Sequence, residues 1–286
     1  MRIVERFLPL LTGFLALTGC SSADVLNFII PRTGYSIHHD IAYGDNKRQH
    51  LDIYVPDKPA PSGSVIVFFY GGSWQKGNKE TYRFVGQALA SKGYVAVIAD
   101  YRVYPEVYFP AFVEDGANAL AWVHGHIREY GGNPSNIFLA GHSAGGYIAV
   151  MLTLNDSYLR AAGGKRSWIK GTIGIAGPYD FLPFTDPNII ALFSKVEDSK
   201  TQPITFVGPG VSPLLLLTGD QDDEVGAKNS QNLVAKLREF DDPVQERIYP
   251  GVAHIGIVLA LADGFRSKAP ILEDIDAFIH ATNDGK

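Results

Sequence analysis

One segment in the middle of the chain constrains the fold more than any other. Residues 136–140 are a short, largely apolar run that leads into Gly-His-Ser-Ala-Gly at 141–145, and an apolar helix-forming stretch follows at 146–154. This order predicts a buried strand, a sharp turn and a helix, with Ser143 in the turn. Gly141 and Gly145 suit a turn where neighbouring backbone passes too close for a Cβ atom. A serine presented in this way can act as a nucleophile beside a base and hydrogen-bond donors.

The rest of the chain alternates between short β-rich runs and helical segments. Strands are expected at 49–55, 65–70, 94–99, 136–140, 171–176, 214–218 and 245–249, and helices at 80–90, 109–130, 146–154, 227–240 and 270–280. Alternation of this kind predicts an α/β fold with a mostly parallel central sheet and helices on both faces. The early strands, alternating apolar and polar residues, predict an antiparallel hairpin at the sheet edge. One domain, 35–286, accommodates all of these elements.

Residues 177–212 do not fit the alternation. They contain five prolines and one short helical patch at 189–196. A connection this long within one domain usually has a function. We therefore expect a small lid or pocket wall over the site, and no separate domain.

The N-terminus has the pattern of a secretion signal. Arg2 and Arg6 precede the apolar run 7–17, which is too short to span a bilayer, and Leu-Thr-Gly-Cys follows at 17–20. This ending resembles a bacterial lipobox, and Cys20 is the only cysteine of the chain. The resemblance implies a signal peptide at 1–19, a lipidated Cys20, a tether at 20–34 and a place in the bacterial cell envelope, at the outer membrane. The alternative is an ordinary signal peptide with an unrelated cysteine.

Composition excludes several classes of partner. The net charge is −5 and 46% of the residues are hydrophobic, which describes a folded globular protein without a basic patch, so nucleic acid is not an expected partner. The same acidic balance leaves membrane attachment to the lipid alone. The histidine pairs His38-His39 and His124-x-His126 lack the helical spacing of a zinc site, and the acidic run 220–224 lacks the spacing of a calcium loop. We expect no metal and no cofactor.

A general base must follow the serine if the order is Ser, acid, His. Only His254 and His280 lie after Ser143. His280 falls within an amphipathic helix, whereas His254 is expected in a loop just after the last strand, where ligands gather in parallel sheets. His254 is therefore the predicted base. His142, beside the serine, is expected to have a packing role.

The acid is chosen from a cluster of carboxylates after strand 214–218. Asp220, Asp222, Asp223 and Glu224 follow that strand, and any of them could reach a histidine at a neighbouring strand end. The spacing Gly-x-x-Asp-x-x-Val favours Asp222, with Asp220 and Asp223 as alternatives.

Hydrogen-bond donors for a developing oxyanion are expected after strand 65–70. The chain continues there as Gly-Gly-Ser-Trp at 71–74. Glycines let backbone N–H groups approach a substrate oxygen, as an oxyanion hole requires. A plain tight turn would show the same residues.

Several blocks in this order resemble the α/β-hydrolase superfamily, in the branch of hormone-sensitive-lipase-like and kynurenine-formamidase-like esterases. Besides the serine turn, they are Leu-Asp-Ile-Tyr-Val-Pro at 51–56, Tyr-Gly-Gly-Ser-Trp at 70–74, and Asp-Tyr-Arg-Val-Tyr-Pro-Glu at 100–106 with Phe-Pro-Ala at 109–111 and Asp115. The similarity spans residues 48–281. Tyr70 and Ser73 replace the histidine and third glycine of the fuller His-Gly-Gly-Gly motif.

The resemblance implies an α/β-hydrolase fold and a serine carboxylesterase without cofactor, acting on small-molecule esters with short to medium acyl groups. The implied site residues are the triad Ser143, Asp222 and His254, the oxyanion donors Gly72, Ser73 and Ala144, and the pocket candidates Trp74, Tyr179, Phe181 and Phe184. An amidase, formamidase or peptidase could use the same triad. A non-catalytic envelope scaffold that kept the fold is the alternative outside enzymes.

Overall fold

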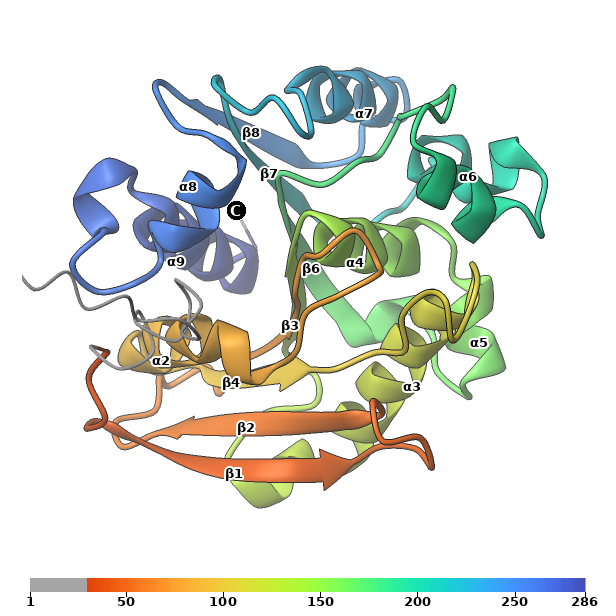
Figure 1. Cartoon of the computed structure of the whole chain (residues 1–286). Helices are drawn as coiled ribbons and strands as arrows, with labels where there is room; N and C mark the ends of the chain where they lie inside the picture. Colours follow the sequence, from red (N-terminus) through yellow and green to blue (C-terminus); the bar gives the residue numbers. More distant parts are fainter. Residues whose placement is uncertain (1–29, 286) are drawn as a thin grey trace, which may run out of the picture.

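The computed structural model describes residues 30–285, so the predicted signal peptide, Cys20 and most of the tether lie outside the described residues. Eight strands form one sheet in the order β1-β2-β4-β3-β5-β6-β7-β8 (Figure 1). Strands β1, β2 and β4 pair antiparallel, and every pair from β4 to β8 is parallel. The strands are β1 Tyr35–Ala42, β2 His50–Pro56, β3 Val65–Phe69, β4 Val95–Ala99, β5 Ile137–His142, β6 Ile169–Ile175, β7 Leu214–Gly219 and β8 Val244–Tyr249.

The predicted strands are all present, with ends shifted by one or two residues. Every residue of β3, β4, β5 and β7 is buried, because helices cover both faces of the parallel part of the sheet. The expected antiparallel hairpin is present at the sheet edge, where β1 pairs with β2 and the polar side chains of β1 face outwards, but β1 itself was not among the expected strands.

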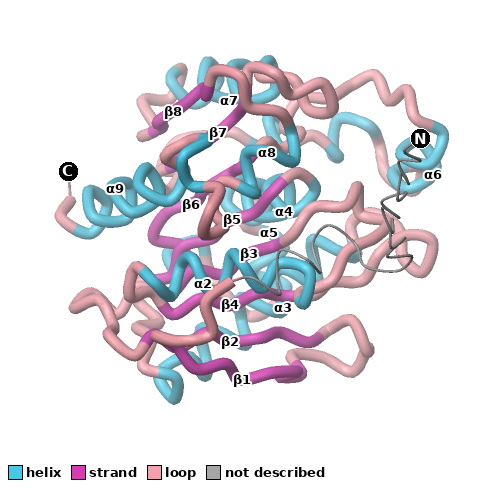
Figure 2. The backbone as a smooth tube through the Cα atoms, turned by 60° about the vertical axis from the view of Figure 1, so that its left-hand side comes forward, coloured by secondary structure: helices cyan, strands magenta, loops and turns pink. Residues whose placement is uncertain are grey.

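Helices lie on both sides of the sheet. Figure 1 shows α2 and α9 on one side and α3, α4 and α7 on the other, and Figure 2 views the molecule from the side of α2, α8 and α9. This arrangement confirms the predicted α/β class. The α-helices are α2 Arg83–Ser91, α3 Ala111–His126, α4 Ala144–Leu154, α5 Ser157–Ala161, α6 Pro187–Phe193, α7 Lys228–Arg238, α8 His254–Leu259 and α9 Ile271–Asn283, and the 3₁₀ turns are η1 Glu80–Tyr82, η2 Ile127–Tyr130, η3 Arg166–Trp168, η4 Asp198–Thr201, η5 Pro203–Phe206 and η6 Arg266–Lys268.

Two expectations need correction. His254 does not lie in a loop but is the first residue of the short helix α8. The helix expected over 109–130 begins at Ala111 and tightens into the 3₁₀ turn η2 after His126. None of the helices within residues 30–285 is long and apolar enough to cross a membrane.

The segment 177–212 packs onto the helix that follows the serine turn. It contains α6, η4 and η5, and α6 starts at Pro187, where the Asp186 side chain accepts hydrogen bonds from the first free N–H groups of the helix. The Tyr147 hydroxyl of α4 donates a 2.7 Å hydrogen bond to the Thr201 carbonyl. The segment is therefore tied to the body of the domain at its middle.

Candidate active site

Ser143 lies between β5 and α4 in a strained backbone conformation. Its φ is 55° and its ψ is −121°, a combination that few non-glycine residues adopt. A Cβ on Gly145 would lie 2.0 Å from the Phe69 carbonyl oxygen, and one on Gly141 would lie 2.2 Å from the Gly145 carbonyl oxygen. Both glycines are thus required for the close passage of β3, β5 and α4, and this passage places Ser143 at the carboxyl end of the sheet.

His254 pairs with Asp222 across two neighbouring strand ends. His254 Nδ1 lies 2.8 Å from Asp222 Oδ2, and the two residues are 3% and 8% exposed. A carboxylate accepts hydrogen bonds, so Nδ1 carries the proton and Nε2 is left with a free lone pair. An imidazole held in this tautomer can take a proton from a hydroxyl.

Local turn geometry selects Asp222 among the neighbouring carboxylates. Its Oδ1 accepts hydrogen bonds from the N–H groups of Glu224 (3.1 Å) and Val225 (2.7 Å), which leaves Oδ2 free for His254. Asp220 instead accepts from the Gly251 N–H, at 2.7 Å, and the side chain of Asp223 is exposed. The structure therefore pairs the histidine with the aspartate that the spacing favours.

Glu224 adds a second negative charge near the imidazole. Its Oε2 lies 3.9 Å from His254 Nε2, and its side chain is 62% exposed. Glu224 also lines two cavities that meet at Ser143 and are described below. Sequence reasoning considered Glu224 only as one carboxylate of the cluster.

His142 is buried against the base and holds its backbone. Its Nε2 lies 3.0 Å from the His254 carbonyl oxygen, and because a carbonyl can only accept, Nε2 carries the proton. Burial, with a smaller contribution from the nearby His254, lowers the pKa of His142 to about 3, so the ring is neutral. The expected packing role is too narrow, since this ring also supports the residue that carries the predicted base.

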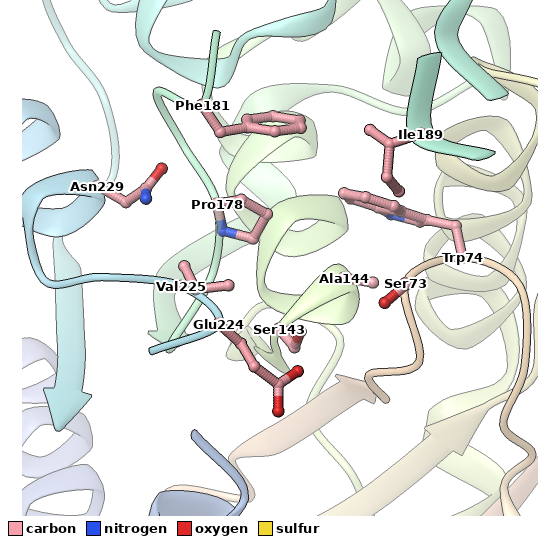
Figure 3. Close-up of a pocket in the computed structure, with 10 residues that line it drawn as sticks. All are labelled: Ser73, Trp74, Ser143, Ala144, Pro178, Phe181, Ile189, Glu224, Val225 and Asn229. Carbon is pink, nitrogen blue, oxygen red and sulfur yellow. The ribbon is translucent and has the colours of Figure 1, made fainter. Parts of the chain in front are cut away.

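Two cavities meet at Ser143. The smaller, about 180 Å³, is lined by Ser73, Trp74, Ser143, Ala144, Pro178, Phe181, Ile189, Glu224, Val225 and Asn229 (Figure 3). The larger, about 570 Å³, is lined by residues 71–73, 76, 77, 81 and 82 together with His142, Ser143, Glu224, His254 and Ile255. Ser143 and His254 thus share the wall of the larger cavity.

The loop after β3 presents backbone donors beside Ser143. Among the hydrogen bonds of residues 30–285, none uses the N–H of Gly72, Ser73 or Ala144. The Gly71 N–H is already used, because it donates to the Tyr82 hydroxyl at 3.2 Å. Figure 3 shows Ser73 and Ala144 on the same side of the smaller cavity. Ser73 and Ala144 thus bring backbone N–H groups without an acceptor among the described residues to the cavity that Ser143 also lines.

Two of the four predicted pocket residues line the smaller cavity and two do not. Trp74 and Phe181 are on its wall. Tyr179 is fully buried behind β6, and its hydroxyl would lie 2.1 Å from a Cβ on Gly174. Phe184 stacks on Phe193 instead of facing the cavity. Aromatic character alone does not distinguish a pocket wall from core.

Sequence reasoning missed several residues that line the smaller cavity. Pro178 and Ile189 belong to the segment that was predicted to be a lid or pocket wall, and Val225 and Asn229 follow the acidic run. The Asn229 side-chain oxygen accepts hydrogen bonds from the N–H groups of Tyr179 and Asp180, each at 3.0 Å. This contact ties the start of the lid segment to α7. No sequence motif marks it.

The described part of the chain contains no cluster of side chains suited to bind a metal ion. No group of three or more His, Cys, Asp or Glu side chains there could hold an ion. His39 instead contacts Asp52, at 2.8 Å.

Comparison with known proteins gives consistent matches. Residues 51–237 match the BD-FAE family. The chain is similar to the isoprenylcysteine alpha-carbonyl methylesterase ICME of Arabidopsis thaliana (28% identity, 96% of this chain, 70% of the relative). It is also similar to esterase LipC of Mycobacterium tuberculosis (29% identity, 84% of this chain, 64% of the relative). The solved structure of an inhibited esterase B of Lactobacillus rhamnosis superposes with a TM-score of 0.78 at 17% identity, covering 92% of each chain, which supports the same fold.

Proposed function

The chain belongs to the BD-FAE family and is a carboxylesterase-type hydrolase with an α/β-hydrolase fold, and we propose that it cleaves short- to medium-chain carboxylic esters through Ser143, His254 and Asp222. The observation that carries this proposal is the buried 2.8 Å contact of Asp222 with His254, which lines the same cavity as Ser143. The contact fixes the tautomer that a base for serine requires.

The reaction follows from these positions. Ser143 Oγ attacks the acyl carbon while its proton passes to His254 Nε2, and Asp222 stabilises the imidazolium that forms. The carbonyl oxygen becomes an oxyanion that accepts hydrogen bonds from the N–H groups of Ser73, Ala144 and Gly72. His254 then gives its proton to the departing alcohol oxygen, and a water molecule hydrolyses the acyl-enzyme by the same route.

The two cavities correspond to the two halves of an ester. The alcohol oxygen must receive its proton from His254, which lines only the larger cavity, so the alcohol belongs there. The acyl chain is left with the smaller cavity of about 180 Å³, between Trp74, Phe181 and Ile189. Its apolar wall and limited size favour short acyl groups.

The test compares nitrophenyl acetate, butyrate and octanoate with the matching nitroanilides. Hydrolysis of the short esters is expected, with octanoate slower and the anilides slower still. Ser143→Ala should abolish turnover and labelling by a fluorophosphonate, whereas the exposed Ser135→Ala should change neither. Ester hydrolysis that survives in Ser143→Ala would refute the mechanism. A wild-type protein that the probe does not label would favour a binding scaffold.

We also propose that Cys20 carries a lipid that holds the enzyme at the bacterial envelope, at the outer membrane. The support is the order of basic residues, apolar run and Leu-Thr-Gly-Cys at the N-terminus. Expressed in a bacterium with two membranes, the full chain is expected in the membrane fraction and Cys20→Ser in the soluble fraction. Equal partitioning of the two forms would contradict lipidation.

A further inference from the structure

The loop that supplies the proposed oxyanion donors has an unusual backbone conformation, which two internal hydrogen bonds to the Gly72 carbonyl and one from the Tyr104 N–H to the Trp74 carbonyl support. We call residues 71–79 the oxyanion loop. Within it φ is 134° at Gly72, 53° at Ser73, 56° at Trp74 and 107° at Gly77. Ser73 and Trp74 adopt the left-handed region at a cost in free energy, so the surrounding structure must impose this conformation. The direction of the Gly72 and Ser73 N–H groups therefore depends on the contacts that other segments of the chain make with the loop.

One side chain from a distant part of the sequence contacts both the residue before the oxyanion loop and the second half of the loop. Arg48, in the connection between β1 and β2, donates from Nη2 to the Gly77 carbonyl (2.6 Å) and to the Tyr70 hydroxyl (3.1 Å). Its Nε donates to the Tyr101 carbonyl, at 3.0 Å, just after β4. A single planar guanidinium thus joins the residue before the loop, the far part of the loop and the end of a neighbouring strand.

The acceptors of Arg48 are themselves rigid. Tyr70 is fully buried, and its ring stacks on Tyr101 and Tyr82 with centroid distances of 4.7 Å and 5.6 Å. The Tyr101 hydroxyl donates to the Tyr70 carbonyl at 2.8 Å, and the Tyr82 hydroxyl accepts from the Gly71 N–H at 3.2 Å. A Cβ on Gly77 would lie 2.8 Å from the Tyr70 ring, so loop and ring fit closely.

Arginine chemistry suits this position. The acceptors are two carbonyls and a phenol from three segments, and only a forked cation with donors on several nitrogens reaches all of them. No carboxylate within the described residues forms a salt bridge with Arg48. Arg48 is not part of either cavity wall, so it does not touch a substrate.

We propose that Arg48 is a positioning residue for the oxyanion hole: through Gly77 and Tyr70 it sets the conformation of the oxyanion loop and so aims the Gly72 and Ser73 N–H groups at the reacting carbonyl oxygen. The inference rests on the proposed esterase function and deepens it. It also explains how Tyr70 functions at the position where related enzymes carry histidine, since its hydroxyl is the arginine's anchor at the start of the loop.

The experiment compares Arg48→Met and Arg48→Lys with wild type on nitrophenyl acetate. Loss of one well-aimed oxyanion donor typically lowers kcat by about 100-fold or more, so a mispositioned loop should lower kcat by about 10- to 100-fold while KM changes less than about threefold. The kcat of Arg48→Lys, which keeps the charge but not the forked geometry of the guanidinium, should lie between those of wild type and Arg48→Met. Affinity for an alkyl boronic acid, which mimics the tetrahedral intermediate, should fall in parallel with kcat.

The matched control is Arg166→Met. Arg166 is also half-buried and donates to a backbone carbonyl, that of Leu154 at 3.2 Å, but it lines neither cavity and does not contact the oxyanion loop. Its kcat and boronate affinity should equal those of wild type even if its thermal midpoint falls. If Arg48→Met does not fold, the same measurements on Arg48→Lys decide.

Each outcome separates the two proposals. Wild-type kcat and boronate affinity in a folded Arg48 variant would overturn the positioning role and leave the esterase intact. A higher KM with an unchanged kcat would likewise overturn the positioning role. Failure of the esterase proposal shows elsewhere, as a wild-type protein without Ser143-dependent turnover. Partial recovery of kcat in Arg48→Gly upon addition of millimolar guanidinium would support positioning, because a general loss of folding would not be restored.

Discussion

His142→Gln should make the protein resist acid better than wild type does. In the folded protein His142 is buried, donates from Nε2 to the His254 carbonyl, and has a pKa of about 3 because burial disfavours its charged form. In the unfolded chain the imidazole is hydrated and has its ordinary value of 6.5. Glutamine can donate an amide N–H to the same carbonyl but does not titrate, so the exchange isolates the contribution of protonation.

The magnitude follows from the two pKa values. A folded pKa below the unfolded one means that stability from His142 is complete above pH 6.5 and is lost as the pH falls from 6.5 towards 3. Each pH unit in that window corresponds to about 1.4 kcal/mol, so protonation of the unfolded chain costs about 2 kcal/mol at pH 5 and about 0.2 kcal/mol at pH 7. The free energy of unfolding of wild type relative to His142→Gln should therefore drop by about 2 kcal/mol between pH 7 and pH 5.

The assay is urea unfolding of wild type and His142→Gln at both pH values, followed by circular dichroism. The quantity compared is the difference in the free energy of unfolding between wild type and His142→Gln at the two pH values. A loss of stability that does not depend on pH therefore cancels. Ser135→Ala is the control, since Ser135 is exposed and does not titrate, so its difference from wild type should be the same at both pH values. A wild-type-minus-His142→Gln difference that stays constant within about 0.5 kcal/mol would show that His142 is not held neutral, and the reasoning from burial would fail.

Three further outcomes are expected. Asp222→Asn should lower kcat for nitrophenyl acetate by about 100- to 10,000-fold, because an amide cannot stabilise the imidazolium of His254; a loss below tenfold would assign the acid elsewhere. Ile189→Ala, which enlarges the wall of the smaller cavity, should raise the ratio of kcat/KM for hexanoate over acetate by roughly tenfold, and an unchanged ratio would place the acyl chain in the other cavity. Tyr147→Phe should lower the free energy of unfolding by about 1–2 kcal/mol in urea titrations, since the Thr201 carbonyl loses a buried donor; a neutral effect would mean that water replaces the hydroxyl.

The predictable part of the molecule is the part where local pattern and tertiary burial agree. Strands β3 and β7 read as continuous apolar runs because both of their faces are covered, and the serine turn shows its glycines because backbone passes within contact of their Cα atoms. Asp222 could be favoured from spacing because its Oδ1 forms a turn with the next residues, which is a local interaction.

Other features were hidden for identifiable reasons. Helix α8 has only six residues, too few to show a helical period, so His254 was assigned to a loop. Tyr179 and Phe181 are both aromatic and two residues apart, yet one is core and the other faces the cavity. Their difference depends on the space that Gly174 leaves beside β6, which only the packed structure defines.

The contacts that hold the catalytic elements share one physical form, which explains why sequence did not reveal them. Arg48 donates to the Gly77 carbonyl, His142 to the His254 carbonyl and Tyr147 to the Thr201 carbonyl. Every residue offers a carbonyl, so the acceptor leaves no mark in the sequence, and the donor stands alone as one polar side chain far from its partner. Because a buried carbonyl that loses its donor cannot regain water without local opening, these three donors should help to hold the site in its observed geometry. The proposed triad could therefore be chosen from motif order and spacing, whereas these supporting contacts became visible only in the fold.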